Sequence, residues 1–233
     1  MERGPGRDVD DDAADTLEAL WRARHSCRGF RPDPVPRATI GRIVDMAQRT
    51  ASWCNAQPWQ LIVTSGAETE AFRRGLVAHV AANPPAPDIA FPQAYRGVYQ
   101  DRRRVCGFAL YEAVGVARGD REASARQAAE NFELFGAPHC AIVSSDGPLG
   151  IYGVLDCGAF VSSFLLAAES LGVATIAQAS VAGYSDFVRS HFAIPQDRTI
   201  VCAISFGFED ADHPANRFRT ERASLAEVVD WRG

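Results

Sequence analysis

The chain has 233 residues, a formal net charge of −5, and 47% hydrophobic and 23% charged residues, a composition typical of a globular protein with a sizeable core. The acidic balance argues against nucleic acid as a partner. All 24 basic residues are arginine, which excludes a P-loop lysine and a lysine Schiff base. A phosphate group would have to be bound by arginine, serine or histidine side chains and by backbone N–H groups.

Hydrophobic periodicity and turn residues predict an α+β protein with a single domain over residues 17–233, preceded by a polar, acidic, flexible tail over residues 1–16. Asp120 is positioned to cap a helix, and four prolines between residues 82 and 93 predict a loop or lid. The end of the chain is mildly strand-like near Val228 and Val229. The pattern predicts helices over 14–23, 38–49, 67–82, 94–117, 120–135 and 154–171, and strands over 59–66, 139–144, 173–179 and 199–207.

The longest apolar run, residues 154–175, is interrupted by Asp156 and Glu169 and is shorter than the ~20 apolar residues of a membrane span. It predicts a buried helix and no membrane partner. No N-terminal stretch resembles a signal peptide, which favours a cytoplasmic protein. The cysteines show no CxxC or ligand-like spacing, so we expect reduced thiols and no metal site; they are residues 27, 54, 106, 140, 157 and 202.

The stretch "WRARHSCRGF", residues 21–30, groups cations in an acidic chain. The prolines that follow must end the first helix here. Two explanations remain open: the cations complement the helix dipole, or they hold an anion such as phosphate. The side chains concerned are Arg24, His25, Ser26 and Arg28.

A second stretch, "RTASWCNAQPW" at residues 49–59, groups Ser52, Asn55 and Gln57 with two tryptophans, Trp53 and Trp59. Amide side chains both donate and accept hydrogen bonds, as the edge of a heterocycle requires, although a hydrogen-bonded turn over the core is an equal alternative. Cys54 lacks a nearby histidine and is interpreted as a bystander thiol.

A third stretch, "NRFRTERASLAEVV" at residues 216–229, again groups cations. Arg217, Arg219 and Arg222 could belong to a solvated surface turn or to an anion site.

Together these stretches resemble the FMN-dependent nitroreductase family. "RHSCRGFRPDPVP" is similar to its opening segment, "ASWCNAQPW" to its "PSSxNxQPW" segment, and "LGVATIAQAS" to the strand that ends beside the flavin ring. "NRFRTERASLAEVV" resembles its C-terminal segment. The ordered set spans roughly residues 17–230 and is far more specific than any one piece.

The resemblance implies a nitroreductase-like mixed sheet flanked by helices, in an intertwined homodimer with FMN at the subunit interface. Arg24 and Ser26 would hold the phosphate with Arg219 and Arg222, or with Arg217 if the register differs. Arg28 would reach the pyrimidine end of the ring, and the Ser180 backbone N–H would face flavin N5. The cofactor-binding set is Arg24, His25, Ser26, Arg28, Ser52, Trp53, Asn55, Gln100, Arg103, Ala179, Ser180, Arg219 and Arg222, with residues 51–55 approaching from the partner subunit.

The implied activity is a ping-pong oxidoreductase that takes hydride from NADPH or NADH and reduces a nitroaromatic or quinone-like acceptor. The flavin carries the chemistry, so no catalytic side chain is expected. Trp53 stands where relatives have a small residue, and Ala51 replaces a proline, which affects the substrate pocket. The alternatives are a related FMN enzyme for reductive dehalogenation or flavin cleavage, and a non-catalytic FMN- or nucleotide-binding sensor.

Overall fold

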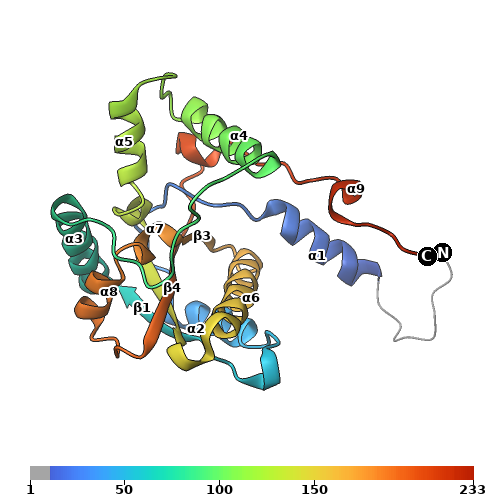
Figure 1. The fold of residues 1–233 in the computed structure, drawn as a ribbon, viewed down its shortest axis with the longest axis horizontal. Coiled ribbons are helices and arrows are strands. Elements are labelled where there is room, and N and C mark those ends of the chain that lie inside the picture. The colour runs from blue at the N-terminus through green and yellow to red at the C-terminus, as the bar shows by residue number, and fades with distance from the viewer. Residues whose placement is uncertain (1–10) are drawn as a thin grey trace.

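The structure is a computed structural model that describes residues 11–233. The ribbon in Figure 1 shows a central sheet surrounded by helices. The helices of four or more residues are α1 (Asp11–Ala23), α2 (Arg37–Ala47), α3 (Ala67–Ala82), α4 (Val98–Ala113), α5 (Arg121–Ala129), α6 (Gly150–Glu169), α7 (Ala179–Ala182), α8 (Ser185–Phe192) and α9 (Leu225–Val228). The strands are β1 (Gln60–Ser65), β2 (His139–Asp146), β3 (Ala174–Gln178) and β4 (Arg198–Gly207).

The sheet has four strands in the order β1-β2-β4-β3, and neighbouring strands are antiparallel. β2 and β4 are central, and β2 is buried over seven of its eight residues, which explains its continuous apolar run. The parallel component among the described residues is the bridge between Ser26 and Thr175. The α+β class is therefore confirmed, and this bridge places the cationic stretch along the outer edge of β3.

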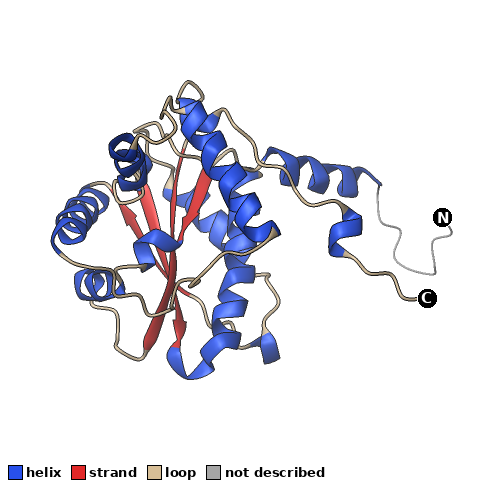
Figure 2. Ribbon diagram, turned by 45° about the horizontal axis from the view of Figure 1, so that its top comes forward, coloured by secondary structure: helices blue, strands red, loops and turns tan. Residues whose placement is uncertain are grey.

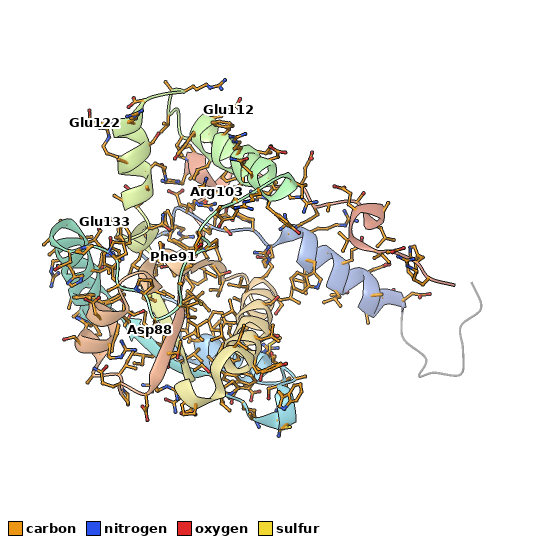
Figure 3. All side chains as sticks on the ribbon, in the orientation of Figure 1. Asp88, Phe91, Arg103, Glu112, Glu122 and Glu133 are labelled. Carbon is orange, nitrogen blue, oxygen red and sulfur yellow. The ribbon has the colours of Figure 1, made fainter. Side chains whose placement is uncertain are left out.

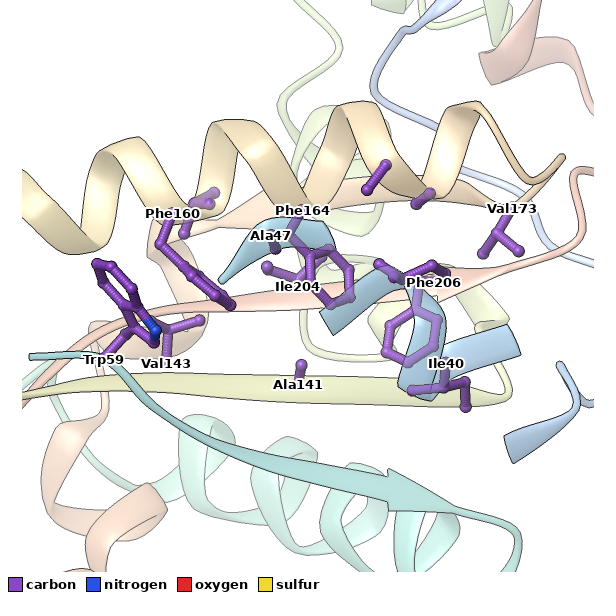
Figure 4. Packing of buried hydrophobic residues seen from close by; sticks show 14 of the residues in the cluster. Ile40, Ala47, Trp59, Ala141, Val143, Phe160, Phe164, Val173, Ile204 and Phe206 are labelled. Carbon is purple, nitrogen blue, oxygen red and sulfur yellow. The ribbon is translucent and has the colours of Figure 1, made fainter. Parts of the chain in front are cut away.

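Helices cover both faces of the sheet (Figure 2), and each face carries its own hydrophobic core. On one face α2 and α6 pack through Ile43, Phe160 and Phe164 (Figure 4). On the other face α3, α7 and α8 pack through residues such as Phe72 and Val188. Each fully buried phenylalanine stabilises the fold by roughly 1.5–3 kcal/mol.

α6 has one buried and one exposed apolar face. Phe160, Phe164 and Ala168 recur every four residues and face the sheet. Within the described chain, residues 147–169 are long and apolar enough to cross a membrane by length and composition. The packing of this helix on the sheet matches the buried helix expected from the sequence, whereas Ile151 is 80% exposed and Leu155 66%.

α1 and the C-terminal segment with α9 extend from the body of the protein to the same side (Figures 1 and 2). Residues 1–10, most of the predicted tail, lie outside the described residues. The remainder of that predicted tail, residues 11–16, belongs to α1, so the first helix begins before the expected residue 14.

Three other expectations differ from the structure. The predicted helices over 94–117 and 120–135 are shorter, because α4 ends at Ala113 and α5 at Ala129. No element was predicted over 179–193, where α7 and α8 form. The strand expected near Val228 is wrong: α9 forms instead, because Ser224 and Glu227 make a capping box. Asp120 does cap α5, as predicted, by accepting a 2.9 Å hydrogen bond from the Ala123 N–H.

Candidate functional site

The first cationic stretch follows α1 and runs in extended form beside β3. Ser26 forms a parallel bridge with Thr175, whose carbonyl accepts a 3.0 Å hydrogen bond from the Cys27 N–H. Side chains alternate along extended backbone, so Arg24, Ser26 and Arg28 share one side of the segment while Cys27 is fully buried on the other. The sequence pattern therefore directs two guanidinium groups and a hydroxyl to the same side.

The third stretch returns to the first through a buried asparagine. The Asn216 side chain accepts a 2.7 Å hydrogen bond from the Arg28 N–H and donates bonds of 2.9 Å to the carbonyls of Gly29 and Asp210. These three hydrogen bonds of the Asn216 amide are all made to backbone groups, so Asn216 fixes the two segments to each other. The residues after Asn216 then lie beside those before Gly29.

The two segments and α1 line a cavity of about 940 Å³. α4 contributes Cys106 to its wall, and α1 contributes Leu17 and Trp21. Arg217 lies outside this lining, because its guanidinium donates to the Asp212 carbonyl. Six of the predicted cofactor-binding residues line the cavity: Arg24, His25, Ser26, Arg28, Arg219 and Arg222.

The lining of the cavity carries an excess of positive charge, with five arginines and one glutamate. Among the described residues, none of Arg24, Arg219 and Arg222 forms an ion pair within 4.0 Å. Burial and the neighbouring Arg222 guanidinium lower the pKa of Arg24, and burial lowers the pKa of Arg28. Unpaired, partly desolvated guanidinium groups are stabilised by an anion, so these residues fit a phosphate group.

His25 lines the same cavity, but its ring is held by its own chain. Its Nε2 lies 3.1 Å from Glu209 Oε1, and its Nδ1 lies 3.3 Å from the Ala23 carbonyl oxygen. Glu169 lies in the same neighbourhood, and its burial raises the pKa of its carboxyl group. Glu209 thus orients the imidazole, and Glu169 is close enough to interact electrostatically with His25, Arg24 and Arg219.

The end of β3 and the start of α7, residues 177–180, form an open surface beside this segment, which we call the shelf. Ala177 and Ala179 are exposed and small, and Ser180 is half-buried at the start of α7. A Cβ on Gly183 would lie 2.8 Å from the Ser180 carbonyl oxygen and 3.3 Å from the Phe91 ring. Phe91, labelled in Figure 3, therefore lies directly over the turn that follows Ser180.

The proline-rich segment between α3 and α4 is anchored at its start. Asp88 Oδ2 accepts hydrogen bonds of 2.6 Å from Arg189 and 2.8 Å from the Ile200 N–H. The Ala86 N–H donates to the Gly183 carbonyl at 2.8 Å. This segment begins as a fixed strap across α7 rather than as a free lid (Figure 3).

The predicted residues on α4, Gln100 and Arg103, do not face the cavity that Arg24 and Arg28 line. Cys106 reaches the cavity, and Arg103 lies one turn earlier on the same helix. The Arg103 guanidinium stacks on Tyr95, with its Cζ 5.1 Å from the ring centroid. Neither Arg103 nor Gln100 lines the cavity of this chain.

The second stretch is remote from the cavity within one chain. Ser52, Trp53 and Asn55 lie beside the start of α6, where the Trp53 N–H donates to Asp156 at 3.1 Å and its ring lies 5.0 Å from that of Tyr152. Cys54, Asn55 and Gln57 all have positive φ angles, of 50°, 56° and 48°. Such backbone is strained for residues other than glycine and is concentrated at functional sites.

The buried thiols Cys27 and Cys157 are poor nucleophiles. Burial raises the pKa of Cys27 to about 12 and that of Cys157 to about 11, so both remain protonated. The six cysteines are free. Residues 11–233 contain no group of three or more His, Cys, Asp or Glu side chains that could hold a metal ion.

A model of the nitroreductase family matches residues 21–208, which include the first two stretches and the whole sheet. The chain belongs to the nitroreductase family. The third stretch lies beyond the matched range and is connected to the first through Asn216.

Relatives of this family member match it over nearly its whole length. It is 32% identical over 219 residues to nitroreductase NfnB of Mycolicibacterium smegmatis, which covers 94% of this chain and 93% of that protein. It is 32% identical over 228 residues to a 4-nitrobenzoate reductase of Nocardioides sp., covering 94% and 89% of the two chains. The crystal structure of the FMN-dependent nitroreductase NfnB from Mycobacterium smegmatis in complex with NADPH superposes with a TM-score of 0.91 at 31% identity, over 95% of this chain and all of that one.

Several residues that shape the candidate site carry no local sequence signal. Asn216 and Glu209 act on the first stretch from about 190 residues away along the chain. Asn131, which contacts Ser180, lies in the connection after α5. Each of them contacts a segment that only the folded chain brings near.

Proposed function

We propose that this protein is an FMN-dependent nitroreductase that takes hydride from NADPH and reduces nitroaromatic acceptors. The observation that carries the proposal is the convergence of Arg24, Arg219 and Arg222 on one cavity, where none of the three forms an ion pair within 4.0 Å among the described residues. The similarity to FMN-dependent NfnB and to a 4-nitrobenzoate reductase supports the same cofactor and class of acceptor.

In this proposal the arginine-lined cavity holds the phosphate end of FMN. Arg24, Ser26, Arg219 and Arg222 would bind the phosphate, because guanidinium forks match phosphate oxygens. Arg28 would stand at the pyrimidine end, where a cation stabilises the negative charge that develops on reduction. When bound, FMN supplies hydride transfer, and the protein supplies binding, orientation and exclusion of water.

The exposed apolar surface supports a homodimer. Ile151 and Leu155 on α6, together with Trp21 on α1 and Trp231 at the C-terminus, are at least 46% exposed and would be buried by a second copy. The extension of α1 and α9 away from the body favours an intertwined arrangement (Figure 2). Light scattering should report twice the mass of the chain, and Leu155→Glu should lower it toward that of a monomer.

The partner subunit would complete each site. Ser52, Trp53 and Asn55 do not line the cavity of their own chain, so they would approach the flavin of the other subunit. Gln100 and Arg103 would contact the ring or the ribityl chain, and Ala179 and Ser180 would lie beside the hydride-accepting edge. We also propose a cytoplasmic location, where NADPH is available.

Steady-state kinetics with NADPH and 4-nitrobenzoate test the proposed reaction. In a ping-pong cycle the apparent kcat/KM for NADPH does not change with the acceptor concentration, and we expect that result. A kcat/KM that rises with acceptor concentration would contradict the ping-pong cycle. Flavin binding without turnover of any nitroaromatic would favour a sensor or another reaction of the family. Turnover with NADH but not with NADPH would show that NADH is the hydride donor.

A further inference from the structure

A chain of side-chain hydrogen bonds holds the turn between β3 and α7. Asn131 Oδ1 accepts a 3.0 Å hydrogen bond from the Ser180 hydroxyl, and the Asn131 carbonyl accepts one of 2.7 Å from Gln178 Nε2. Gln178 Oε1 in turn accepts from the hydroxyl of Ser205 on β4. Gln178 and Ser205 are buried, whereas Ser180, at the other end of this series of hydrogen bonds, is half-buried.

The donor and the acceptor of each hydrogen bond in this series follow from the other hydrogen bonds that the same side chains make. Asn131 Nδ2 donates to the Ala128 carbonyl at 3.1 Å, so Oδ1 must be the atom that faces Ser180. An amide oxygen can only accept, and therefore the Ser180 hydroxyl donates its proton to Asn131. The lone pairs of Ser180 Oγ remain available on the side away from Asn131.

These lone pairs matter because of where Ser180 lies. The cationic stretch is paired with β3 at Thr175, and Ser180 follows the same strand beyond its exposed alanines. Phe91 covers the following turn at Gly183. Ser180 is therefore the hydroxyl at the far end of the shelf that begins at the proposed phosphate site.

We propose that Asn131 is a positioning residue that directs the Ser180 hydroxyl proton away from the cofactor. The inference rests on the proposed function. The hydride-accepting nitrogen of a flavin accepts hydrogen bonds when the ring is oxidised, and it carries an N–H when the ring is reduced. The backbone N–H of Ser180 suits the first state, and the lone pairs of Ser180 Oγ suit the second, so one residue can serve both. No proton moves along the chain of hydrogen bonds.

The flavin midpoint potential of the purified holoenzyme tests this inference. Ser180→Ala removes the acceptor, and Asn131→Ala frees the hydroxyl to turn its proton toward the ring; both should destabilise the reduced cofactor. A neutral hydrogen bond changes an equilibrium constant by up to about tenfold, which corresponds to a potential about 30 mV lower for a two-electron couple. The dissociation constant for FMN should stay within about twofold, because neither side chain lines the phosphate cavity.

The double variant separates positioning from a general structural effect. If Asn131 acts through Ser180, Asn131→Ala should add no further shift to Ser180→Ala. Additive shifts, or an unchanged potential in Asn131→Ala, would overturn the inference. Asn83→Ala is the matched control, since the Asn83 amide bonds to His79 at the end of α3, and its potential should equal that of the wild type.

Two further outcomes remain decisive. If Asn131→Ala does not fold, Ser180→Ala alone decides, because an unchanged potential would show that Oγ makes no contact with the reduced cofactor. If the wild-type chain binds no FMN, the proposed function fails first and the inference fails with it. If FMN binds and is reduced while the variants keep the wild-type potential, only the inference fails.

Discussion

Arg28 and Asn216 are joined by a 2.7 Å hydrogen bond from the Arg28 backbone N–H to Asn216 Oδ1, although they are separated by 188 positions in the chain. This bond places the C-terminal arginines against the cationic stretch that follows α1. The cavity between them exists because the two ends of the chain are joined at this point. An anion held by both ends would stabilise the same arrangement.

Arg24→Ala should weaken FMN binding by at least about tenfold, because a hydrogen bond to a charged group contributes about 1.5–3 kcal/mol. Fluorescence titration of the apoprotein with FMN measures this change. Arg217→Ala is the matched control, since Arg217 is exposed and lies outside the cavity lining. Equal FMN affinities of the two variants would show that the first cationic stretch is a solvated helix end and does not bind the phosphate.

Trp53→Ser should widen the range of acceptors. Trp53 is 64% exposed within one chain and packs on Tyr152, so in the proposed dimer its indole is free to narrow the partner's pocket. The ratio of kcat/KM for a bulky nitroaromatic to that for nitrobenzene should rise in the variant. An unchanged ratio would show that Trp53 does not select acceptors by size.

Gly29→Ala should destabilise the protein by about 1–3 kcal/mol, the cost of overpacking a filled site. A Cβ at Gly29 would lie 2.2 Å from His213 Cγ and 2.5 Å from His213 Cβ, so the backbone would have to move. Gly41→Ala is the control, because nothing lies within 4 Å of its Cβ position on α2 and alanine favours a helix by about 0.5–1 kcal/mol. Urea unfolding of both variants should give opposite signs. Two equal changes would contradict the close packing at Gly29.

The stability of the protein should fall below about pH 6.5 because of His139. Its buried Nε2 accepts a 2.9 Å hydrogen bond from the Val35 N–H, and burial lowers the pKa of the imidazole. The unfolded chain therefore binds a proton before the folded one does, so this contribution is complete above the ordinary pKa and is lost as the pH falls through and below it.

Urea unfolding between pH 5 and 8 measures the effect of His139. His139→Asn should be less stable than the wild type at pH 8 and should depend less on pH. Ser65→Ala removes a neighbour of the ring but keeps the imidazole, so its pH dependence should follow the wild type. A wild-type slope in His139→Asn would assign the pH dependence to other groups.

The regular elements were predictable where local chemistry determines them. α3 matches the range predicted from its apolar spacing, with Phe72 and Leu76 buried one turn apart. The strand expected near Val228 and Val229 is wrong, because the capping box formed by Ser224 and Glu227 outweighs the strand propensity of the two valines. α7 and α8 are short and follow directly on a buried strand, so their packing rather than their propensity decides their form.

The candidate site was predictable in its charges and less so in its supports. The arginines are conspicuous in an acidic chain, and six predicted residues meet at one cavity. Asn216 and Asn131 escaped prediction, because a single asparagine in a connection has no periodicity to mark it. The place of Ser52, Trp53 and Asn55 depends on a second copy of the chain, so that part of the site stays a prediction.

We expect this chain to hold a flavin and to pass electrons from NADPH to a nitroaromatic through it. The most direct measurement is the visible absorption spectrum of the purified protein, reconstituted with FMN, before and after anaerobic addition of NADPH. We expect a flavin spectrum that bleaches with NADPH and returns when a nitroaromatic is added. A protein that retains no flavin, or a bound flavin that neither NADPH nor NADH bleaches, would contradict the account.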